Sequence, residues 1–141
     1  LDGALFFALY SGHRETADML LNLGARPGRR SSSNGLHGAA RRGFQEETRL
    51  YITASEAEPD VCDGLEVTPV MYALQLKEPH DWNTIQLLFE LGADPEAIIG
   101  DGSWSYAELA SLMDKEDLPT RLDQAARASR SCRSSCTIDW S

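Results

Sequence analysis

The sequence contains no apolar run long enough to cross a membrane. Its richest apolar stretch, ALFFALY at residues 4–10, is soon followed by His13 and Arg14. A membrane helix needs roughly 18 apolar residues, so this stretch is about a third of the required length. We therefore expect residues 4–10 to be buried in a protein core, and we expect no membrane partner.

Cysteine is also scarce. The chain has only Cys62, Cys132 and Cys136, an odd number with two of them close together, and this does not make a disulfide framework. A reducing compartment, the cytoplasm or the nucleus, is the expected location. Cys132 and Cys136 have neither a second cysteine pair nor a following histidine, which closed zinc sites require. We therefore expect no metal and no cofactor.

Signatures of catalysis are missing as well. The sequence has no glycine-rich phosphate loop after a strand and no G-x-S-x-G motif. Carboxylates gather at 46–47 and at 56–60, but these segments are expected to be exposed faces and loops. His80 lies beside Asp81 without a nucleophile or a third ligand. We therefore expect no catalytic residue, and the chain is not expected to be an enzyme.

Positive charge is rare in the second part of the chain. Residues 1–50 hold seven basic and five acidic residues, and residues 51–141 hold six basic and seventeen acidic residues, which gives the net charge of -9. Nucleic-acid binding depends largely on the neutralisation of phosphates by a sustained basic surface. This charge distribution argues against nucleic acid as a partner.

What the sequence does contain is an internal repeat. Residues 20–25 read LLNLGA, and residues 87–93 read LLFELGA. Four equivalent positions, spaced 31, 34 and 36 residues apart, are Leu5, Leu36, Val70 and Tyr106. Three residues after each of them come Ala8, Ala39, Ala73 and Leu109. Self-similarity near 33 residues is typical of an array of helical repeats.

Each repeat is expected to form two short helices. In the first repeat, Leu5, Ala8 and Leu9 lie on one helical face, and the small alanine lets a second helix approach closely. Gly12 supplies the turn, and Gly24 ends the second helix where a left-handed backbone is favourable. The second repeat has Ser55 at the position of Gly24, which should cost about 1 kcal/mol if the backbone is left-handed there.

The third repeat departs from this pattern. The segment LKEPHD at 76–81 replaces a two-residue linker, and Pro79 cannot continue a helix. We expect an accessible inserted loop at 76–82, which includes Lys77, His80 and Trp82, followed by an outer helix that begins at Asn83.

These residues resemble the ankyrin repeat family. Its T-P-L-H-x-A motif corresponds to TPVMYA at 68–73, NGLHGA at 34–39 and GALFFA at 3–8, and Gly-Ala-Asp occurs at 92–94. The resemblance implies an all-α fold, an ankyrin-like solenoid of stacked helix-turn-helix repeats with short loop or hairpin connections. It also implies that His13 and His37 make structural hydrogen bonds between turns.

The resemblance sets expected boundaries. With 141 residues, 42% of them hydrophobic, the chain fits one domain. We expect an ankyrin-like domain at 1–128, with repeats at about 2–30, 31–62 and 63–97 and a degenerate capping unit at 98–128. The tail at 129–141, rich in Ser and Arg, is expected to be disordered. The first repeat has no polar cap, so we expect either further repeats before it or self-association at this edge.

Ankyrin arrays bind other proteins through a concave groove, so the resemblance implies a set of partner-binding residues. At the ends of the inner helices these are Tyr10, Ser11, Arg41, Arg42, Gln75 and Leu76. At the loop tips they are Arg30, Ser33, Leu65, Val67, Ser103 and Trp104. We hypothesise that an acidic or phosphorylated segment of another protein docks near the arginines, with Tyr10 as an apolar anchor. The alternative is a solvated basic patch that binds nothing.

Two other functions stay open from the sequence. The chain could be a regulatory or substrate-recruiting arm of a larger enzyme whose catalytic domain lies elsewhere. It could also be a structural spacer or a decayed gene product, which the irregular third linker would fit.

Overall fold

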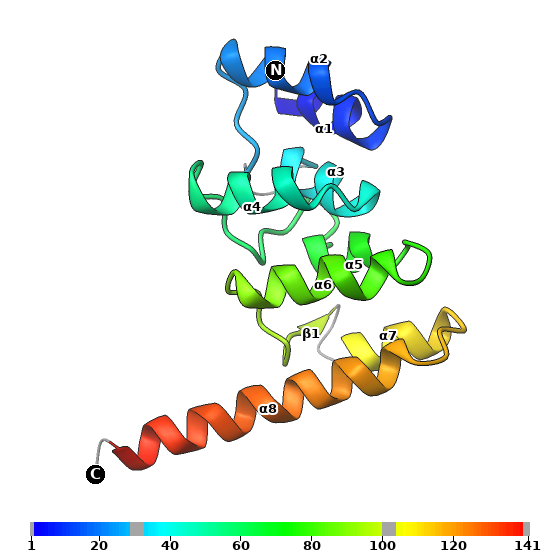
Figure 1. Ribbon diagram of the computed structural model, residues 1–141, viewed down its shortest axis with the longest axis vertical. Helices are drawn as coiled ribbons and strands as arrows, with labels where there is room; N and C mark the ends of the chain where they lie inside the picture. Colours follow the sequence, from blue (N-terminus) through cyan, green and yellow to red (C-terminus); the bar gives the residue numbers. More distant parts are fainter. Residues whose placement is uncertain (1, 29–32, 100–103, 140–141) are drawn as a thin grey trace. The chain divides into compact units, whose positions relative to one another are not determined.

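The computed structural model describes residues 2–28, 33–99 and 104–139, with residues 131–139 described by their backbone alone. This part of the chain contains eight helices and two short strands (Figure 1). It is therefore mostly helical, as predicted. Contacts divide the chain into two compact units, Leu1–Ala93 and Asp94–Ser141, where the sequence predicted one domain.

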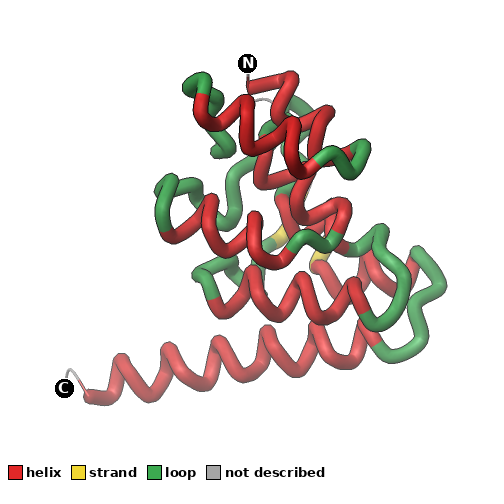
Figure 2. The backbone as a smooth tube through the Cα atoms, turned by 45° about the horizontal axis from the view of Figure 1, so that its top comes forward, coloured by secondary structure: helices red, strands yellow, loops and turns green. Residues whose placement is uncertain are grey.

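The first unit is built from helical hairpins. Its helices are α1 (Asp2–Tyr10), α2 (Arg14–Asn22), α3 (Gly35–Arg42), α4 (Gln45–Thr53), α5 (Pro69–Ala73) and α6 (His80–Glu90). Within this unit α3 packs against α1 and against α5, so the first helices of successive hairpins stack in a row (Figures 1 and 2). The second helix predicted in the first repeat corresponds to α2, and the outer helix predicted in the third repeat corresponds to α6.

Small residues determine how closely these inner helices pack. Six consecutive residues of α3 are buried, from Gly35 to Ala40. A Cβ atom added to Gly38 would lie 2.9 Å from the carbonyl oxygen of Phe6 and 3.0 Å from Cβ of Leu9. The backbone of α3 therefore lies directly against α1, as the alanine-rich face of the repeat predicted.

Side chains fix where the inner helices start. The Asn34 side chain accepts a hydrogen bond from the backbone N–H of His37 (3.1 Å), and His37 Nδ1 accepts from the N–H of Asn34 (3.3 Å). His37 Nε2 donates to the carbonyl oxygen of Val61 at 2.8 Å. The predicted structural role of His37 is thus confirmed. It was wrong for His13, whose side chain is exposed and has no hydrogen bond to any described residue.

The outer helices end in a left-handed residue that precedes a buried alanine. Gly24 (φ 103°) and Gly92 (φ 116°) behave as predicted. In the second hairpin, however, the left-handed residue is Glu56 (φ 57°) rather than Ser55. The second outer helix ends at Thr53, the aligned equivalent of Asn22 in α2, but the turn after it is one residue longer. The N–H of Ala57 bonds to the carbonyl of Tyr51, six residues back, whereas Ala25 bonds five residues back.

The third hairpin has a shorter connection than predicted. Helix α6 begins at His80 and not at Asn83, so Trp82 lies in the helix and not in an inserted loop. Pro79 occupies the N-cap, and Asp81 in the first turn accepts a hydrogen bond from the N–H of Trp82 at 2.6 Å. An acidic residue in the first turn favours helix initiation here.

The second unit combines a short β-hairpin with two helices. Strands β1 (Ile98–Ile99) and β2 (Trp104–Ser105) pair antiparallel and are followed by α7 (Tyr106–Leu112) and α8 (Leu118–Asp139). Ser105 and Glu108 form a capping box at the start of α7. The unit has its own small core, formed by Tyr106, Ala110, Leu118 and Leu122. Helix α7 packs on α8 within this unit, and the capping unit predicted at 98–128 falls inside it.

Residues 129–139 of the tail predicted to be disordered belong to a helix in the structure. Helix α8 continues through Asp139, and residues 140–141 lie outside the described residues. No Gly or Pro occurs from Thr120 to Asp139, and the early part of this segment is rich in Ala and Arg. A helix that has already formed extends through neutral residues such as Ser and Cys when no helix breaker interrupts it.

Candidate partner-binding surface

The structure brings Tyr10 and Arg41 together, two residues that the sequence proposed as partner-binding. Tyr10 is the last residue of α1, and Arg41 lies near the end of α3. The guanidinium carbon of Arg41 lies 5.7 Å from the centroid of the Tyr10 ring, which is within the range of a cation–π contact. Gln75, at the equivalent position after α5, is exposed.

Aromatic rings extend this pair along the inner helices. The Phe6 ring lies 5.5 Å from the rings of both Phe7 and Tyr10 and 6.1 Å from the ring of Tyr72 on α5. Phe7 is 68% exposed and Tyr10 is 43% exposed. We call Phe6, Phe7, Tyr10 and Tyr72 the aromatic surface.

Sequence reasoning missed three members of the aromatic surface. Phe6 and Phe7 belong to residues 4–10, which were expected in the core, although Phe7 is exposed, and Tyr72 was treated as a motif residue. A usable signal was present in the alignment, since Tyr72 follows Val70 by two residues as Phe7 follows Leu5. Equivalent positions in stacked helices lie on the same face of the array, so large rings at both positions indicate a shared surface.

Asp63 holds the ring of Tyr72 in place. The Tyr72 hydroxyl donates to Asp63 Oδ2 at 2.7 Å, and Asp63 Oδ1 accepts from the N–H groups of Leu65 (2.8 Å) and Val67 (2.9 Å). Burial alone would raise the pKa of Asp63, but these hydrogen bonds lower it below its usual value. Burial, together with the bond to Asp63, raises the pKa of Tyr72 to about 12. At neutral pH the pair is therefore a carboxylate and a neutral phenol.

The hydrogen bonds of Asp63 also order the loop tip that was predicted to contact a partner. Leu65 is 85% exposed, and Val67 is half-buried. The half-buried Ser33 also forms a side-chain hydrogen bond with Tyr72. Three of the predicted loop positions, Ser33, Leu65 and Val67, are thus linked directly to the aromatic surface or to the carboxylate that supports it.

The two adjacent arginines of α3 lie in different environments. Neither Arg41 nor Arg42 has an acidic partner among the described residues. Arg41 is half-buried over Tyr10, and its Nε atom is buried with no described hydrogen-bond partner. Arg42 lies over the first hairpin turn, where one of its terminal nitrogens is 2.6 Å from the place a Cβ on Gly12 would occupy. Of these two arginines, only Arg41 therefore lies beside the aromatic surface.

Arg14, by contrast, forms an ion pair with Glu47 within the chain. Its guanidinium bonds to both carboxylate oxygens of Glu47, with the second contact at 2.7 Å, and it lies 4.2 Å from the centroid of the Phe44 ring. The hydrogen bond to Glu47 raises the pKa of Arg14. Its charge joins α2 to α4 and is already balanced within the chain.

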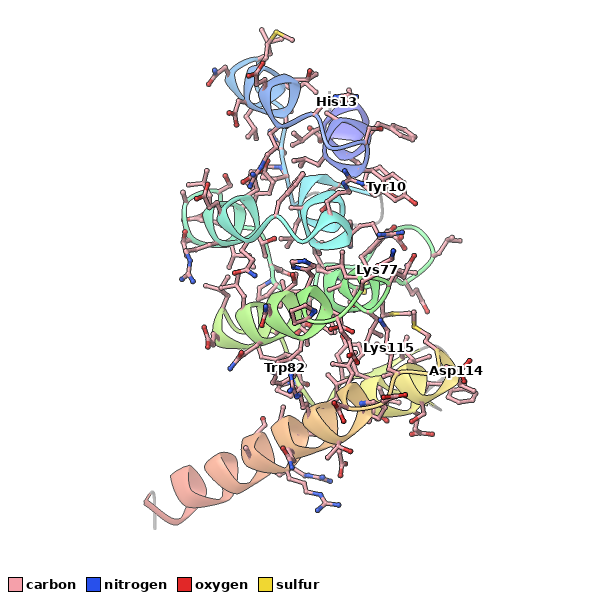
Figure 3. All side chains as sticks on the ribbon, turned by 45° about the vertical axis from the view of Figure 1, so that its right-hand side comes forward. Tyr10, His13, Lys77, Trp82, Asp114 and Lys115 are labelled. Atoms are coloured by element: carbon pink, nitrogen blue, oxygen red, sulfur yellow. The ribbon has the colours of Figure 1, made fainter. Side chains whose placement is uncertain are left out.

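The remaining predicted residues are not all placed near this surface. Ser11 is exposed after α1, and Leu76 is half-buried. Arg30 and Ser103 lie outside the described residues. Trp104 belongs to β2 of the second unit. Lys77, from the segment predicted as a loop, lies on the same flank of the first unit as Tyr10 (Figure 3).

Other features of the described chain offer less to a ligand. An open hollow of about 550 Å³ lies at the ends of α2 and α4, where Arg26 and Glu56 are its charged residues. Among the described residues no group of three His, Cys, Asp or Glu side chains is arranged to hold a metal ion. Within the same residues, every helix is too short or too polar to span a membrane.

Sequence comparisons with known proteins identify no relative of this chain. The sequence matches no protein-family model, and a search of curated proteins finds no match.

Proposed function

We propose that the chain is a protein-interaction module built from ankyrin-like repeats. Two observations support the ankyrin-like interpretation. The motif segments 3–8, 34–39 and 68–73 fall at the starts of α1, α3 and α5, and these three helices stack in a row. The small residues of α3 are used for close packing, as the resemblance implies for an inner helix.

The aromatic surface is the observation that carries the proposal. Proteins seldom leave adjacent large rings in solvent unless they meet a partner. Aromatic side chains and arginine are also the residues enriched at the centres of protein interfaces. Here Phe7 and Tyr10 are exposed, and the Arg41 guanidinium beside them is not balanced by an acidic group of the described chain.

The proposed role is binding without catalysis or cofactor. The side chains of the aromatic surface include no general base that faces a nucleophile, and the ionised Asp63 is occupied by Tyr72 and two backbone N–H groups. We propose a reducing compartment, the cytoplasm or the nucleus, as the place of action. Cys62 is a free, exposed thiol, which fits such a compartment.

Affinity capture with matched variants tests the proposal. The tagged chain would be used to capture proteins from cell extract as wild type, Phe7→Glu and Leu50→Glu, followed by mass spectrometry. Phe7 and Leu50 are both exposed apolar residues on helices of the first unit, but Leu50 lies on α4, away from the aromatic surface. We expect Phe7→Glu to lose the captured partner and Leu50→Glu to retain it.

Two results would count against the module. One is a set of captured proteins that is the same for all three forms, and the other is equal loss in both variants when both remain folded by circular dichroism. The first would show that the aromatic surface is not used, and the second would show nonspecific adhesion of apolar groups.

A further inference from the structure

We infer that Arg41 and the aromatic surface together recognise one carboxylate that lies two residues from an apolar side chain. The occupant is an extended segment of another protein that contains Asp or Glu together with an aromatic or aliphatic residue. This inference rests on the proposed function and specifies the chemistry of the partner at the same surface.

The position of Arg41 makes it a recognition group. Its guanidinium is held over the Tyr10 ring, and its buried Nε has no described partner, so packing rather than an ion pair fixes its orientation. The terminal amino groups are then the donors available to a ligand. A guanidinium presents such donors as a planar fork that fits the two oxygens of a carboxylate.

The number of available charges favours a carboxylate over a phosphate. A phosphorylated residue carries roughly -1.5 to -2 charges and is typically bound by several arginines. Here Arg14 is paired with Glu47, and Arg42 lies over the turn at Gly12. Among the described residues, one guanidinium, that of Arg41, therefore remains beside the aromatic surface.

Nearby negative charge also favours a carboxylate over a phosphate as the ligand. The ionised Asp63 is bonded to Tyr72, which is itself part of the aromatic surface. A doubly charged phosphate would be repelled more strongly by this carboxylate than a singly charged carboxylate ligand would be. Of the acidic and phosphorylated segments considered from the sequence, the acidic one is therefore the better match.

The spacing of the ligand residues follows from the spacing of the rings. Side chains at i and i+2 of an extended strand point to the same side, roughly 7 Å apart. The Arg41 guanidinium lies 5.7 Å from the Tyr10 ring, and the Phe6 ring lies a further 5.5 Å from Tyr10 with Phe7 beside it. When the carboxylate meets Arg41, the side chain two residues away therefore lies over the rings.

A peptide array tests this chemistry. The probes are eight-residue peptides in a Gly/Ser background with Leu, Phe or Trp at one position and Asp, Asn or phosphoserine two residues away, in both orders. The full chain is applied as wild type, Arg41→Gln, Arg42→Gln and Phe7→Glu. Arg42→Gln is the matched control, because it removes an adjacent charge on the same helix that lies outside the aromatic surface.

We expect the wild type to bind Asp peptides at least about tenfold more tightly than Asn peptides, as for other hydrogen bonds between charged groups. Arg41→Gln should abolish this preference, and Arg42→Gln should change it by less than about twofold. Arg41→Lys should recover only part of it, because the charge remains but the fork is lost.

Several results would overturn the inference. These are equal binding of Asp and Asn peptides, stronger binding of phosphoserine peptides, equal loss in Arg41→Gln and Arg42→Gln, or no binding of any peptide by the wild type. Its failure can be told apart from failure of the interaction module. If Phe7→Glu loses the captured partner while Arg41→Gln retains it, the module stands and carboxylate recognition falls. If neither variant loses the partner, both the interaction module and carboxylate recognition are contradicted.

Discussion

At the scale of a single residue, His37 connects the start of α3 to the loop before α5. Its Nδ1 accepts from the N–H of Asn34, so the ring proton must be on Nε2, which donates to the carbonyl of Val61. A second proton on Nδ1 would remove the acceptor that helps to cap α3. Burial, the main cause, lowers the pKa of His37 below its usual value of 6.5.

This lowered pKa predicts that the protein loses stability under mildly acidic conditions. Below about pH 6.5 the unfolded chain binds a proton at His37 that the folded chain resists, so the free energy of unfolding falls as the pH falls. Asp63 does not contribute in this range, because its pKa is lowered and its stabilisation is lost only below its usual value of 3.8. We expect a lower urea midpoint at pH 5.5 than at pH 7.5. The free energy of unfolding should fall by at most about 1.4 kcal/mol per pH unit for one group.

Replacement of the imidazole provides the control for this titration. In His37→Gln, the difference between the two pH values should be smaller than in the wild type, although the variant is less stable overall. A wild-type free energy of unfolding that is the same at pH 5.5 and 7.5 would contradict the assignment.

The left-handed backbone at Glu56 predicts that its replacement by glycine stabilises the protein. A residue with a side chain at φ 57° has a left-handed backbone that costs about 1–2 kcal/mol, whereas glycine adopts it freely. Part of this gain is offset because glycine is more flexible in the unfolded chain. We therefore expect Glu56→Gly to raise the free energy of unfolding by about 0.5 kcal/mol, measured by urea titration.

The reverse substitution at the matching position is the control. Gly24 has φ 103°, and a Cβ added there would meet no atom within 4 Å, so Gly24→Ala reports backbone strain without a clash. It should lower the free energy of unfolding by about 1 kcal/mol. Effects of the same sign in both variants would show that another interaction dominates.

At the scale of the helices, the contact between α1 and α3 predicts unequal effects of two glycine substitutions. Gly38→Ala places a methyl group 2.9 Å from the backbone oxygen of Phe6, so the helices must separate. We expect a loss of about 1–3 kcal/mol in the free energy of unfolding. Gly3→Ala on α1 meets nothing within 4 Å and should stabilise the helix by up to about 1 kcal/mol. Thermal unfolding of both variants checks the pair, and equal shifts would contradict the close packing.

The helices themselves were largely predictable because their positions depend on local signals. Leu5, Ala8 and Leu9 are all buried on α1, as their helical spacing indicated. Pro79 marked the end of one helical segment, but the start of α6 was placed three residues late. Sequence spacing shows that a helix cannot pass through proline, yet it does not show how soon the next helix begins after it.

The length of α8 illustrates a different limit. The Ser- and Arg-rich composition of 129–141 suggested disorder, whereas continuation of the helix through Asp139 depends on a helix nucleated upstream by Leu118 and Leu122, which are buried. Composition describes a segment in isolation and does not include the preformed helix to which it is attached.

At the scale of the whole molecule, uneven charge and exposed apolar residues predict weak self-association through the first hairpin. Met19 (55% exposed) and Leu23 (63% exposed) lie at the end of α2. The net charge of -9 opposes association, but residues 1–50 contain seven basic and five acidic residues, so repulsion is smallest there.

Sedimentation velocity across the micromolar range, at moderate salt, should therefore show a sedimentation coefficient that rises with concentration. Met19→Lys combined with Leu23→Lys should suppress the rise, and Leu112→Lys, which removes a similarly exposed leucine from the second unit, should not. A monomer at every concentration would contradict the prediction.

The candidate site was only partly predictable. The alignment placed Tyr10 and Arg41 at equivalent positions, and stacking of the helices brought them together. It could not separate Arg41 from Arg42, because their difference depends on the space above Gly12 and on the ring of Tyr10, both of which belong to the first hairpin. Nor could it show that Asp63 supports Tyr72, since that contact requires the folded loop.

The glycine at position 38 also determines which parts of this scaffold are free to change. Because its backbone is in contact with α1, any larger residue there must push the two helices apart, whatever ligand the protein binds. Positions 7, 10, 41 and 75 are not so constrained. A combinatorial library that keeps Gly35 and Gly38 and randomises those four positions should yield variants with new ligand preferences on an unchanged framework.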